Sequence, residues 1–292
     1  MFSTGYIDKK MKHSGLSNGF IIAALMIRTI GACAAGMDDP AAGSLRWSVD
    51  TAHHCLYVYG GGDMPDAQPG GYEEWNEWKD SITTVVLGDS ITAVGQWVFS
   101  GWGIRSIRLG RMTNTIGAHA FQYCRSLQDV RSTEQVACIG ASAFAYCDSL
   151  RWPAFSDRLD TIGDYAFERC TALDSLVLTG RMSVVGSSVF AGCSGVTSAS
   201  FYNAQAQMGR RMFYGCVSLQ QVALPKSLQR IPEAAFSGCT ALRSISLPQS
   251  VGNIDERAFS GCSSMRSIDL PKACRVAPHA LDGVPLRRMN RY

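Results

Sequence analysis

Apolar side chains recur along this chain with a period of about 23 residues. The segment "IPEAAFSGCTALRSISLPQSV", which begins at Ile231, is followed 23 residues later by "IDERAFSGCSSMRSIDLPKAC", which begins at Ile254. Each unit has a Phe, usually after Ala or Val, then usually a Cys three residues later, then a short segment of the form L-x-x-I-x-L. The phenylalanines are Phe99, Phe121, Phe144, Phe167, Phe190, Phe213, Phe236 and Phe259, and the cysteines are Cys124, Cys147, Cys170, Cys193, Cys216, Cys239 and Cys262.

The alternation at the end of L-x-x-I-x-L predicts a short strand with one buried face. Pro225, Pro248 and Pro271 follow three of these segments and end the strand, because proline has no N–H to donate. The chain then reaches a second apolar anchor, usually Ile-Gly, and a short helical or irregular turn that carries the Phe. The strand is interrupted at Pro153, and the segment 128–137 has no clear strand leucine, so we expect irregular coils there.

One such unit cannot bury its own apolar residues, whereas stacked units bury a continuous column of each. The repeat therefore predicts an α/β solenoid with short parallel strands, one per coil, over residues 81–292. The Phe and Cys columns form its structural ladder. We interpret the cysteines as small buried hydrophobes, because zinc sites use close pairs such as C-x-x-C and this chain has none. Pairing among Cys55, Cys138 and Cys274, which lie off the column, stays open.

The two ends of the chain differ from the repeat. Residues 1–33 resemble an export signal, with a basic stretch, the apolar run "GFIIAALMI" and small residues before Cys33. Cys33 is either lipidated, because "IGAC" resembles a lipobox, or removed by cleavage after Ala34. We expect residues 34–80 to form a β-rich cap module in which His53 and His54 lie at a hairpin turn. Tyr72, Trp75, Trp78 and Trp97 are expected to cover the first coil, and residues 281–292 the last.

The repeat pattern I-G-x-x-A-F-x-x-C-x-x-L-x-x-I-x-L-P resembles the BspA-type leucine-rich repeat. The resemblance covers about residues 81–288. The preceding "LRWSVDTAHHCLYVYGGGDMPD" and "WNEWKDSITTVVLGDSI" resemble the module that precedes such repeats in this family. The resemblance implies a surface-exposed or secreted bacterial protein that adheres to host extracellular-matrix or cell-surface proteins, or to other bacteria.

Charge and motifs narrow the classes of function. The formal net charge is +3, and outside the leader basic and acidic residues are equal in number. A neutral chain lacks the general basic field that nucleic acid or an anionic membrane would require, so the only expected membrane contact is a lipid anchor. The sequence has no H-E-x-x-H, G-x-S-x-G or phosphate-binding glycine motif. We therefore expect neither an enzyme nor a cofactor or metal.

The exposed side chains on and beside the predicted strands are the remaining candidates for a functional site. The first variable positions of L-x-x-I-x-L, together with Trp152, are the candidate partner-binding residues: Arg105, Gln128, Arg151, Trp152, Asp174, Gln220, Arg243 and Arg266. Solenoids use such rows of exposed side chains to bind proteins. The sequence predicts an exported protein, either a surface lipoprotein or secreted, that binds proteins and mediates adhesion. The alternatives are an assembly component of the cell envelope and an accessory subunit of a secreted enzyme. The oligomeric state is not predicted.

Overall fold

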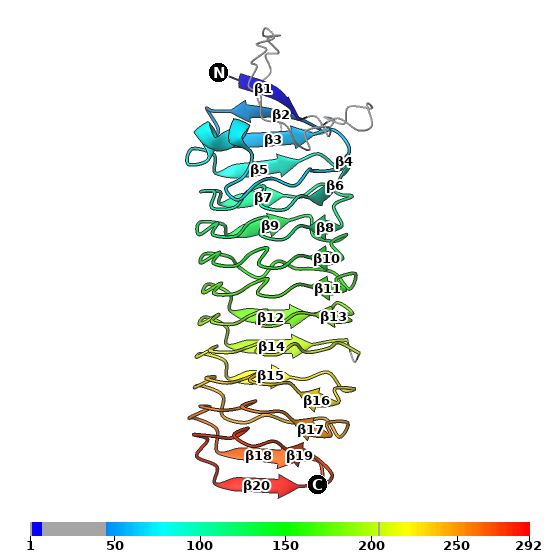
Figure 1. Ribbon diagram of the computed structural model, residues 1–292, viewed down its shortest axis with the longest axis vertical. Helices are drawn as coiled ribbons and strands as arrows, with labels where there is room; N and C mark the ends of the chain where they lie inside the picture. The colour runs from blue at the N-terminus through cyan, green and yellow to red at the C-terminus, as the bar shows by residue number, and fades with distance from the viewer. Residues whose placement is uncertain (1, 8–44, 204) are drawn as a thin grey trace.

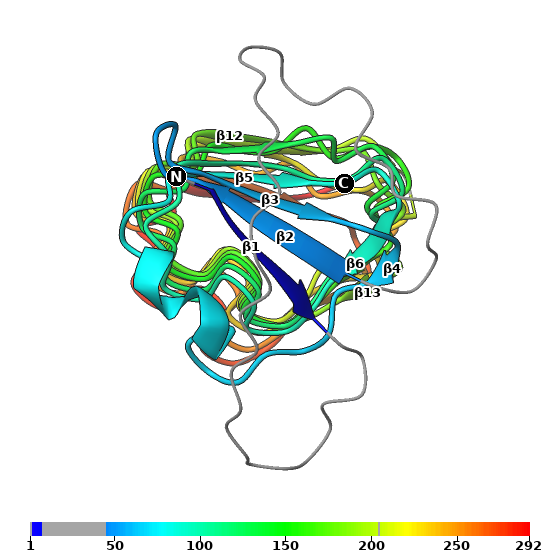
Figure 2. The same ribbon diagram turned by 90° about the horizontal axis from the view of Figure 1, so that it is seen from above.

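The computed structural model describes residues 2–7, 45–203 and 205–292, and shows a rod of stacked coils (Figure 1). The predicted solenoid is confirmed, with parallel strands that repeat every 23 residues in the register Ser175↔Ser198 and Ser198↔Gln221. The phenylalanine turn is irregular rather than helical in every coil. The single helix of the described residues is the 3-10 helix η1 (Glu73–Trp78), which lies outside the coils when the rod is seen along its axis (Figure 2).

Each coil carries up to two short strands, so the strands form two rows along the rod. The first strand row is built from the L-x-x-I-x-L segments: β5 (Thr84–Leu87), β7 (Ser106–Arg108), β9 (Asp129–Arg131), β12 (Ser175–Leu178), β14 (Ser198–Phe201), β15 (Gln221–Ala223), β18 (Ser267–Leu270) and β20 (Arg288–Arg291). The second strand row holds the Ile-Gly anchors: β6 (Ile91–Val94), β8 (Thr115–Ile116), β10 (Cys138–Ile139), β11 (Thr161–Ile162), β13 (Val184–Val185), β16 (Arg230–Ile231), β17 (Asn253–Ile254) and β19 (Arg275–Val276).

The first strand row is interrupted where the sequence places Pro153. The strands of this row form three separate sheets. The coil between β9 and β12 has no strand in this row, since β10 and β11 belong to the second strand row. Side chains bridge the gap: Thr133 Oγ1 donates to Ala154 O at 3.0 Å and Ser156 Oγ donates to Glu134 O at 2.7 Å. At residues 128–137 Val130 fills the strand position and pairs with Ile107, but the chain then departs from the repeat, because Ser132, at the position of Leu109, is left-handed with φ of 61°.

The core is a set of columns that run through the coils. The Phe rings stack with centroids 5.2–5.6 Å apart and planes within 17° of parallel, from Phe99 to Phe259. All eight are fully buried, as are the seven cysteines of the Cys column. The buried columns predicted from the repeat are therefore confirmed.

The N-terminal end is closed by antiparallel strands and aromatic rings. β1 (Phe2–Ile7), β2 (Leu45–Asp50) and β3 (Cys55–Tyr59) extend the first strand row, and β4 (Gly62–Asp63) extends the second. His53 and His54 lie in the β2–β3 turn, as expected. Trp75 is fully buried on the end of the Phe column, with its ring centroid 5.8 Å from that of Phe99. The remainder of the expected leader, with Cys33, lies outside the described residues.

The C-terminal end is closed by β20 and the last residue. β20 pairs in parallel with β18, and the Tyr292 hydroxyl donates a hydrogen bond to Leu247 O. Leu281 takes the place of Phe in this coil and is half-buried, as are Val284 and Leu286. This segment therefore covers the last coil less completely than Trp75 and its neighbours cover the first.

Candidate interaction surface

The first strand row presents alternate side chains to solvent. In β12, Leu176 and Leu178 are 1% exposed, whereas Val177 between them is 44% exposed. Successive side chains of a strand point to opposite faces, so the apolar pair I-x-L fixes which residues face outward. The residues before each strand continue this outer surface, and seven of the eight candidate residues are exposed there: Arg105, Gln128, Arg151, Asp174, Gln220, Arg243 and Arg266.

The fold stacks these seven positions directly on one another. Gln128 N donates to Arg105 O at 2.8 Å, and Arg151 N donates to Gln128 O at 3.1 Å. Farther along the rod, Thr197 links Asp174 to Gln220 through backbone hydrogen bonds of 2.7 and 2.8 Å, and Arg266 N donates to Arg243 O at 3.2 Å. We call this row the polar column. Residues 23 positions apart in sequence thus lie next to each other on one surface.

Most side chains of the polar column have no partner within the protein. Asp174 accepts a hydrogen bond from Thr197 Oγ1 at 2.8 Å, and the Arg266 guanidinium donates to Ser263 O at 2.7 Å. In the described part of the chain, the side chains of Arg105, Arg151 and Arg243 make no hydrogen bond or ion pair. These donors are free to bind carboxylates or carbonyls of another molecule.

Trp152 does not belong to this surface. It is half-buried, its ring lies 5.3 Å from Phe167 and 5.7 Å from Phe190, and its Nε1 donates to Val177 O at 3.2 Å. Proline at position 153 interrupts the strand, so the alternation that would turn Trp152 outward is lost and the ring packs against the Phe column. The expectation that Trp152 is displayed to a partner is therefore corrected, and its role is to fill the gap between sheets.

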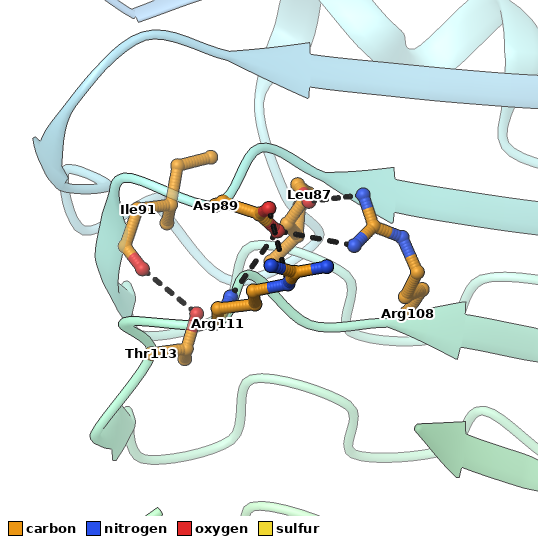
Figure 3. Close-up of polar contacts among 6 residues, drawn as sticks. All are labelled: Leu87, Asp89, Ile91, Arg108, Arg111 and Thr113. Atoms are coloured by element: carbon orange, nitrogen blue, oxygen red, sulfur yellow. Dashed lines mark hydrogen bonds and ion pairs between the residues drawn. The ribbon is translucent and has the colours of Figure 1, made fainter. Parts of the chain in front are cut away.

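Charged residues at the corner between the two strand rows are mostly paired across coils. Asp89, in the turn after β5, binds both Arg108 of β7 and Arg111, with N···O distances of 3.1 and 3.4 Å (Figure 3). Thr113 Oγ1 donates to Ile91 O at 2.8 Å beside them. These contacts join adjacent coils, so their charges have a structural role.

An open groove of about 990 Å³ continues from this corner. Its charged lining is mixed, with Arg111, Arg158 and Arg181 beside Asp157 and Asp160. Because both basic and acidic side chains line the groove, it has no excess of one charge by which it could select a charged ligand.

The Cys column makes a contact that the sequence pattern did not predict. Each thiol donates a hydrogen bond to the carbonyl of a Phe in the preceding coil, from Cys124 Sγ to Phe99 O at 3.0 Å through Cys262 Sγ to Phe236 O at 3.2 Å. The pattern shows where the thiols lie but not how the S–H bond is directed, so no sequence signal identified this contact.

Burial keeps these thiols protonated. Loss of hydration raises the pKa of Cys124 to about 12 and raises that of Cys147, Cys170 and Cys193 well above the ordinary value. A buried, protonated thiol is a poor nucleophile and a poor metal ligand. No disulfide joins any two of the described cysteines, and Cys138 and Cys274 are free thiols.

The histidines make local contacts. His53 Nδ1 lies 2.7 Å from Asp50, His279 Nδ1 lies 2.8 Å from Asp282, and His119 stacks on Trp97 with centroids 3.9 Å apart. Residues 2–7, 45–203 and 205–292 contain no group of three or more His, Cys, Asp or Glu side chains placed to hold a metal ion. The same residues include no helix long and apolar enough to span a membrane.

Solved structures of several bacterial proteins are similar to this chain in fold. A leucine-rich repeat protein from Bacteroides ovatus is 20% identical, with a TM-score of 0.43 and coverage of 82% of this chain and 90% of its own. The T. pallidum leucine-rich repeat protein is 19% identical, with a TM-score of 0.47 and coverage of 78% and 90%. A leucine-rich cell surface protein from Faecalibacterium prausnitzii is 16% identical, with a TM-score of 0.34 and coverage of 88% and 96%.

No functionally curated protein matches the chain at a significant level. The family profile described as "BspA type Leucine rich repeat region" matches it in 6 copies, over residues 76–197 and 160–281. These residues include every coil from Trp97 to Leu281, with the Phe column, the Cys column, the second strand row from β6 to β19 and the first strand row from β5 to β18. The chain belongs to the BspA-type leucine-rich repeat family.

Proposed function

We propose that this chain is an exported protein whose solenoid binds other proteins at the cell surface, with adhesion to host or bacterial surface proteins as its role. The polar column carries this proposal. It places Arg105, Arg151 and Arg243, whose side chains make no hydrogen bond or ion pair in the described part of the chain, on one row of stacked coils, and Arg is enriched among the residues that dominate protein interfaces. Leucine-rich repeat proteins of this kind are generally binding proteins without catalytic activity, which agrees with the absence of an active-site motif.

A binding screen tests the proposal. The purified chain is applied to immobilised extracellular-matrix proteins and to whole bacterial cells, and binding is measured by biolayer interferometry and flow cytometry. We expect at least one protein target, whose binding is weakened by Arg243→Glu combined with Arg266→Glu. The matched control is Arg158→Glu combined with Arg181→Glu, which makes the same charge change at the corner groove. Equal losses in both variants, or no target at all, would contradict the proposal.

Export is a separate part of the proposal and depends on the fate of Cys33. The mature N-terminus of wild type and Cys33→Ala, expressed in a related bacterium, is identified by mass spectrometry. Lipidation at Cys33 together with protease accessibility on intact cells supports a surface lipoprotein. Cleavage after Ala34 supports free secretion, and an intact leader inside the cell contradicts export.

Assembly with its own copies is the second candidate, and the C-terminal end of the rod favours it. β20 pairs with one strand in the described residues, and Met289 on it is 48% exposed. Exposed Arg288 and Arg291 on the same strand oppose this role, because charged residues on an edge strand discourage pairing with another strand. A molar mass that rises with concentration in sedimentation experiments would favour assembly over adhesion.

A further inference from the structure

One backbone position of the repeat is filled differently in three consecutive coils. The residue two positions after each Phe has a left-handed conformation in every coil. Six coils place glycine there: Gly101, Gly192, Gly215, Gly238, Gly261 and Gly283. The three coils between Gly101 and Gly192 place Tyr123, Tyr146 and Arg169 there, with φ of 63°, 63° and 56°.

These three residues adopt a conformation that costs energy for any side chain with a Cβ and that glycine adopts freely. The other left-handed position of the repeat, two residues before Phe, holds a residue other than glycine in every coil, Ser188 and Ala234 among them, so the fold tolerates this cost there. The three coils are set apart because only they carry a side chain where six coils have glycine. Glycine fills the position in the neighbouring coils of the same fold, so folding does not require the larger side chains. The use of Tyr123, Tyr146 and Arg169 is therefore to be sought on the surface.

On the surface the three side chains form one continuous row, which we call the tyrosine ladder. The Tyr123 and Tyr146 ring centroids lie 4.9 Å apart with planes tilted by 30°, and the Arg169 guanidinium lies 5.9 Å from the Tyr146 centroid. Tyr123 is 44% exposed. The stacking fixes the rings relative to one another, so the exposed Tyr123 and Arg169 and the half-buried Tyr146 form one rigid row.

More aromatic rings lie in or next to these coils. Trp97, His119 and Tyr165 occupy the other left-handed position of the repeat, two residues before Phe, with φ of 62°, 57° and 58°. Trp97 and His119 stack on each other, and Tyr165 is 42% exposed. Ser142 takes this position in the coil of Tyr146, so these rings do not form a second continuous ladder.

The charges around the ladder do not favour a polyanion. Arg125 is paired with Asp148 at 2.9 Å, and Arg169 is accompanied by the half-buried Glu168. A surface of tyrosine edges with balanced charge fits an uncharged, apolar partner that still offers hydrogen-bond acceptors. Proline-rich segments in the polyproline II conformation have this chemistry, with apolar rings and fully solvated carbonyls, and they bind aromatic-lined surfaces.

The spacing of the ladder agrees with that partner. Adjacent coils are about 4.8 Å apart, so two coils span about 9.6 Å. Polyproline II rises about 3.1 Å per residue and turns once in three residues, which gives a repeat of about 9.3 Å. The two-residue repeat of an extended strand, about 6.7 Å, does not match the coil spacing. A polyproline II segment laid along the rod would present the same edge to Tyr123 and Arg169, which lie two coils apart, and a different edge to Tyr146 between them.

We propose that the tyrosine ladder binds a proline-rich segment of a protein partner in the polyproline II conformation. Proline rings contact the tyrosine rings, and the phenol hydroxyls and the Arg169 guanidinium donate hydrogen bonds to the carbonyls of the segment. This inference rests on the proposed protein-binding function and names a surface distinct from the polar column.

N-acetyl decaproline is the probe, and a glycine–serine peptide of equal length is its control. We expect calorimetry to show binding of decaproline alone to the full chain, and Tyr123→Gly combined with Tyr146→Gly to weaken it by about tenfold or more. The double variant has the backbone and side-chain pattern of six other coils, so its melting temperature should be unchanged or higher. Tyr202→Ala, which alters a 72% exposed tyrosine after β14, should leave binding unchanged.

The outcomes separate this inference from the proposed function. No binding of decaproline to wild type, or equal binding by the double glycine variant, overturns the inference. A double variant that unfolds also overturns it, because the tyrosines would then be required by the fold. Decaproline binding that survives Arg243→Glu with Arg266→Glu supports the ladder as a separate surface. If the screen finds a protein target whose binding is unchanged by the ladder variants, the proposed function is supported and this inference is not.

Discussion

Stacked phenylalanine rings hold the coils together at the level of single residues. Phe190 lies 5.5 Å from Phe167 and 5.6 Å from Phe213, and the half-buried Trp152 packs at its edge. A ring in the middle of the column contacts two coils besides its own. Removing it leaves a cavity that neighbouring backbones, fixed by strand pairing, cannot fill.

We expect Phe190→Ala to lower the free energy of unfolding by about 3–5 kcal/mol. Urea unfolding followed by far-ultraviolet circular dichroism measures the change. Tyr202→Ala removes an exposed aromatic side chain from the same part of the rod and should alter stability by less than about 0.5 kcal/mol. An unchanged unfolding midpoint for Phe190→Ala would show that the column does not stabilise the rod.

The buried thiols make stability depend on pH in the alkaline range. Their pKa values are raised by burial, to about 12 for Cys124 and Cys262, whereas unfolded cysteine ionises near the ordinary value. Below the pKa of an unfolded cysteine, the thiols are protonated in both the folded and the unfolded chain, and they cause no loss of stability. As the pH rises above about 8.5, the unfolded chain loses protons that the folded chain retains, so stability falls.

Each buried thiol should lower the free energy of unfolding by up to about 1.4 kcal/mol per pH unit in this range. Urea titrations under reducing conditions at several pH values between about 7 and about 10 measure the slope. Cys193→Ala, which removes one such thiol, should give a shallower slope than wild type. Identical slopes would mean that Cys193 ionises equally in both states.

Single residues also show where prediction from sequence fails. The repeat period identified every member of the Phe column and the Cys column, because a column needs only a fixed spacing. Trp152 was misplaced because the alternation rule assumes a continuous strand, and Pro153 ends it. The tyrosine ladder was overlooked because position and φ become visible only in three dimensions. Its sequence signal is the replacement of the Gly before Cys by Tyr, Tyr and Arg in three successive coils.

At the scale of elements, the distance between coils is set by the second strand row. The glycine of each Ile-Gly pair lies against the backbone of the preceding coil. A Cβ added to Gly140 would lie 2.5 Å from Ala118 N and 2.7 Å from Gly117 C, both backbone atoms. Gly252 lies two residues before the anchor Ile254 rather than after it, and there the nearest atom to an added Cβ is Gln229 O at 3.9 Å.

Gly140→Ala should therefore destabilise the protein by about 1–3 kcal/mol, because the two coils must move apart. Gly252→Ala is the control. It should be neutral or stabilise the protein by up to about 1 kcal/mol, because alanine restricts the unfolded chain and meets no clash. Thermal unfolding of both variants measures the difference, and equal melting temperatures would show that the close approach does not set the spacing.

The strand rows were predictable in part. Proline at position 153 indicated the break between sheets, since it cannot donate to a ladder. At 128–137, however, Val130 alone was enough to form β9, because its neighbour β7 supplies a pairing partner in register. The second strand was described from the sequence only as an apolar anchor, since two residues are too few to show a period.

At the scale of the whole molecule, each coil contacts mainly the coils before and after it. Stability in such rods is approximately the sum of coils and of interfaces between neighbours. The positions that join successive coils are equivalent: Phe236-Ser237-Gly238-Cys239 recurs as Phe259-Ser260-Gly261-Cys262.

Deletion of residues 237–259 should accordingly leave a folded, shorter rod, because Phe236 would then join Ser260 in the existing register. Small-angle scattering should show a maximum dimension shorter by about 5 Å, one coil spacing. Deletion of residues 237–248 removes half a coil and should abolish cooperative unfolding or lower the melting temperature strongly. Equal stability of the two deletions would contradict a structure assembled from whole coils.

The uniform register of the Phe and Cys columns also has a consequence for the gene. Recombination between the coding segments of two coils adds or removes whole coils in frame, and both columns remain continuous across the junction. Length can therefore change by whole coils without breaking either column, whereas the loss of any one of the three coils that carry Tyr123, Tyr146 and Arg169 would shorten the tyrosine ladder.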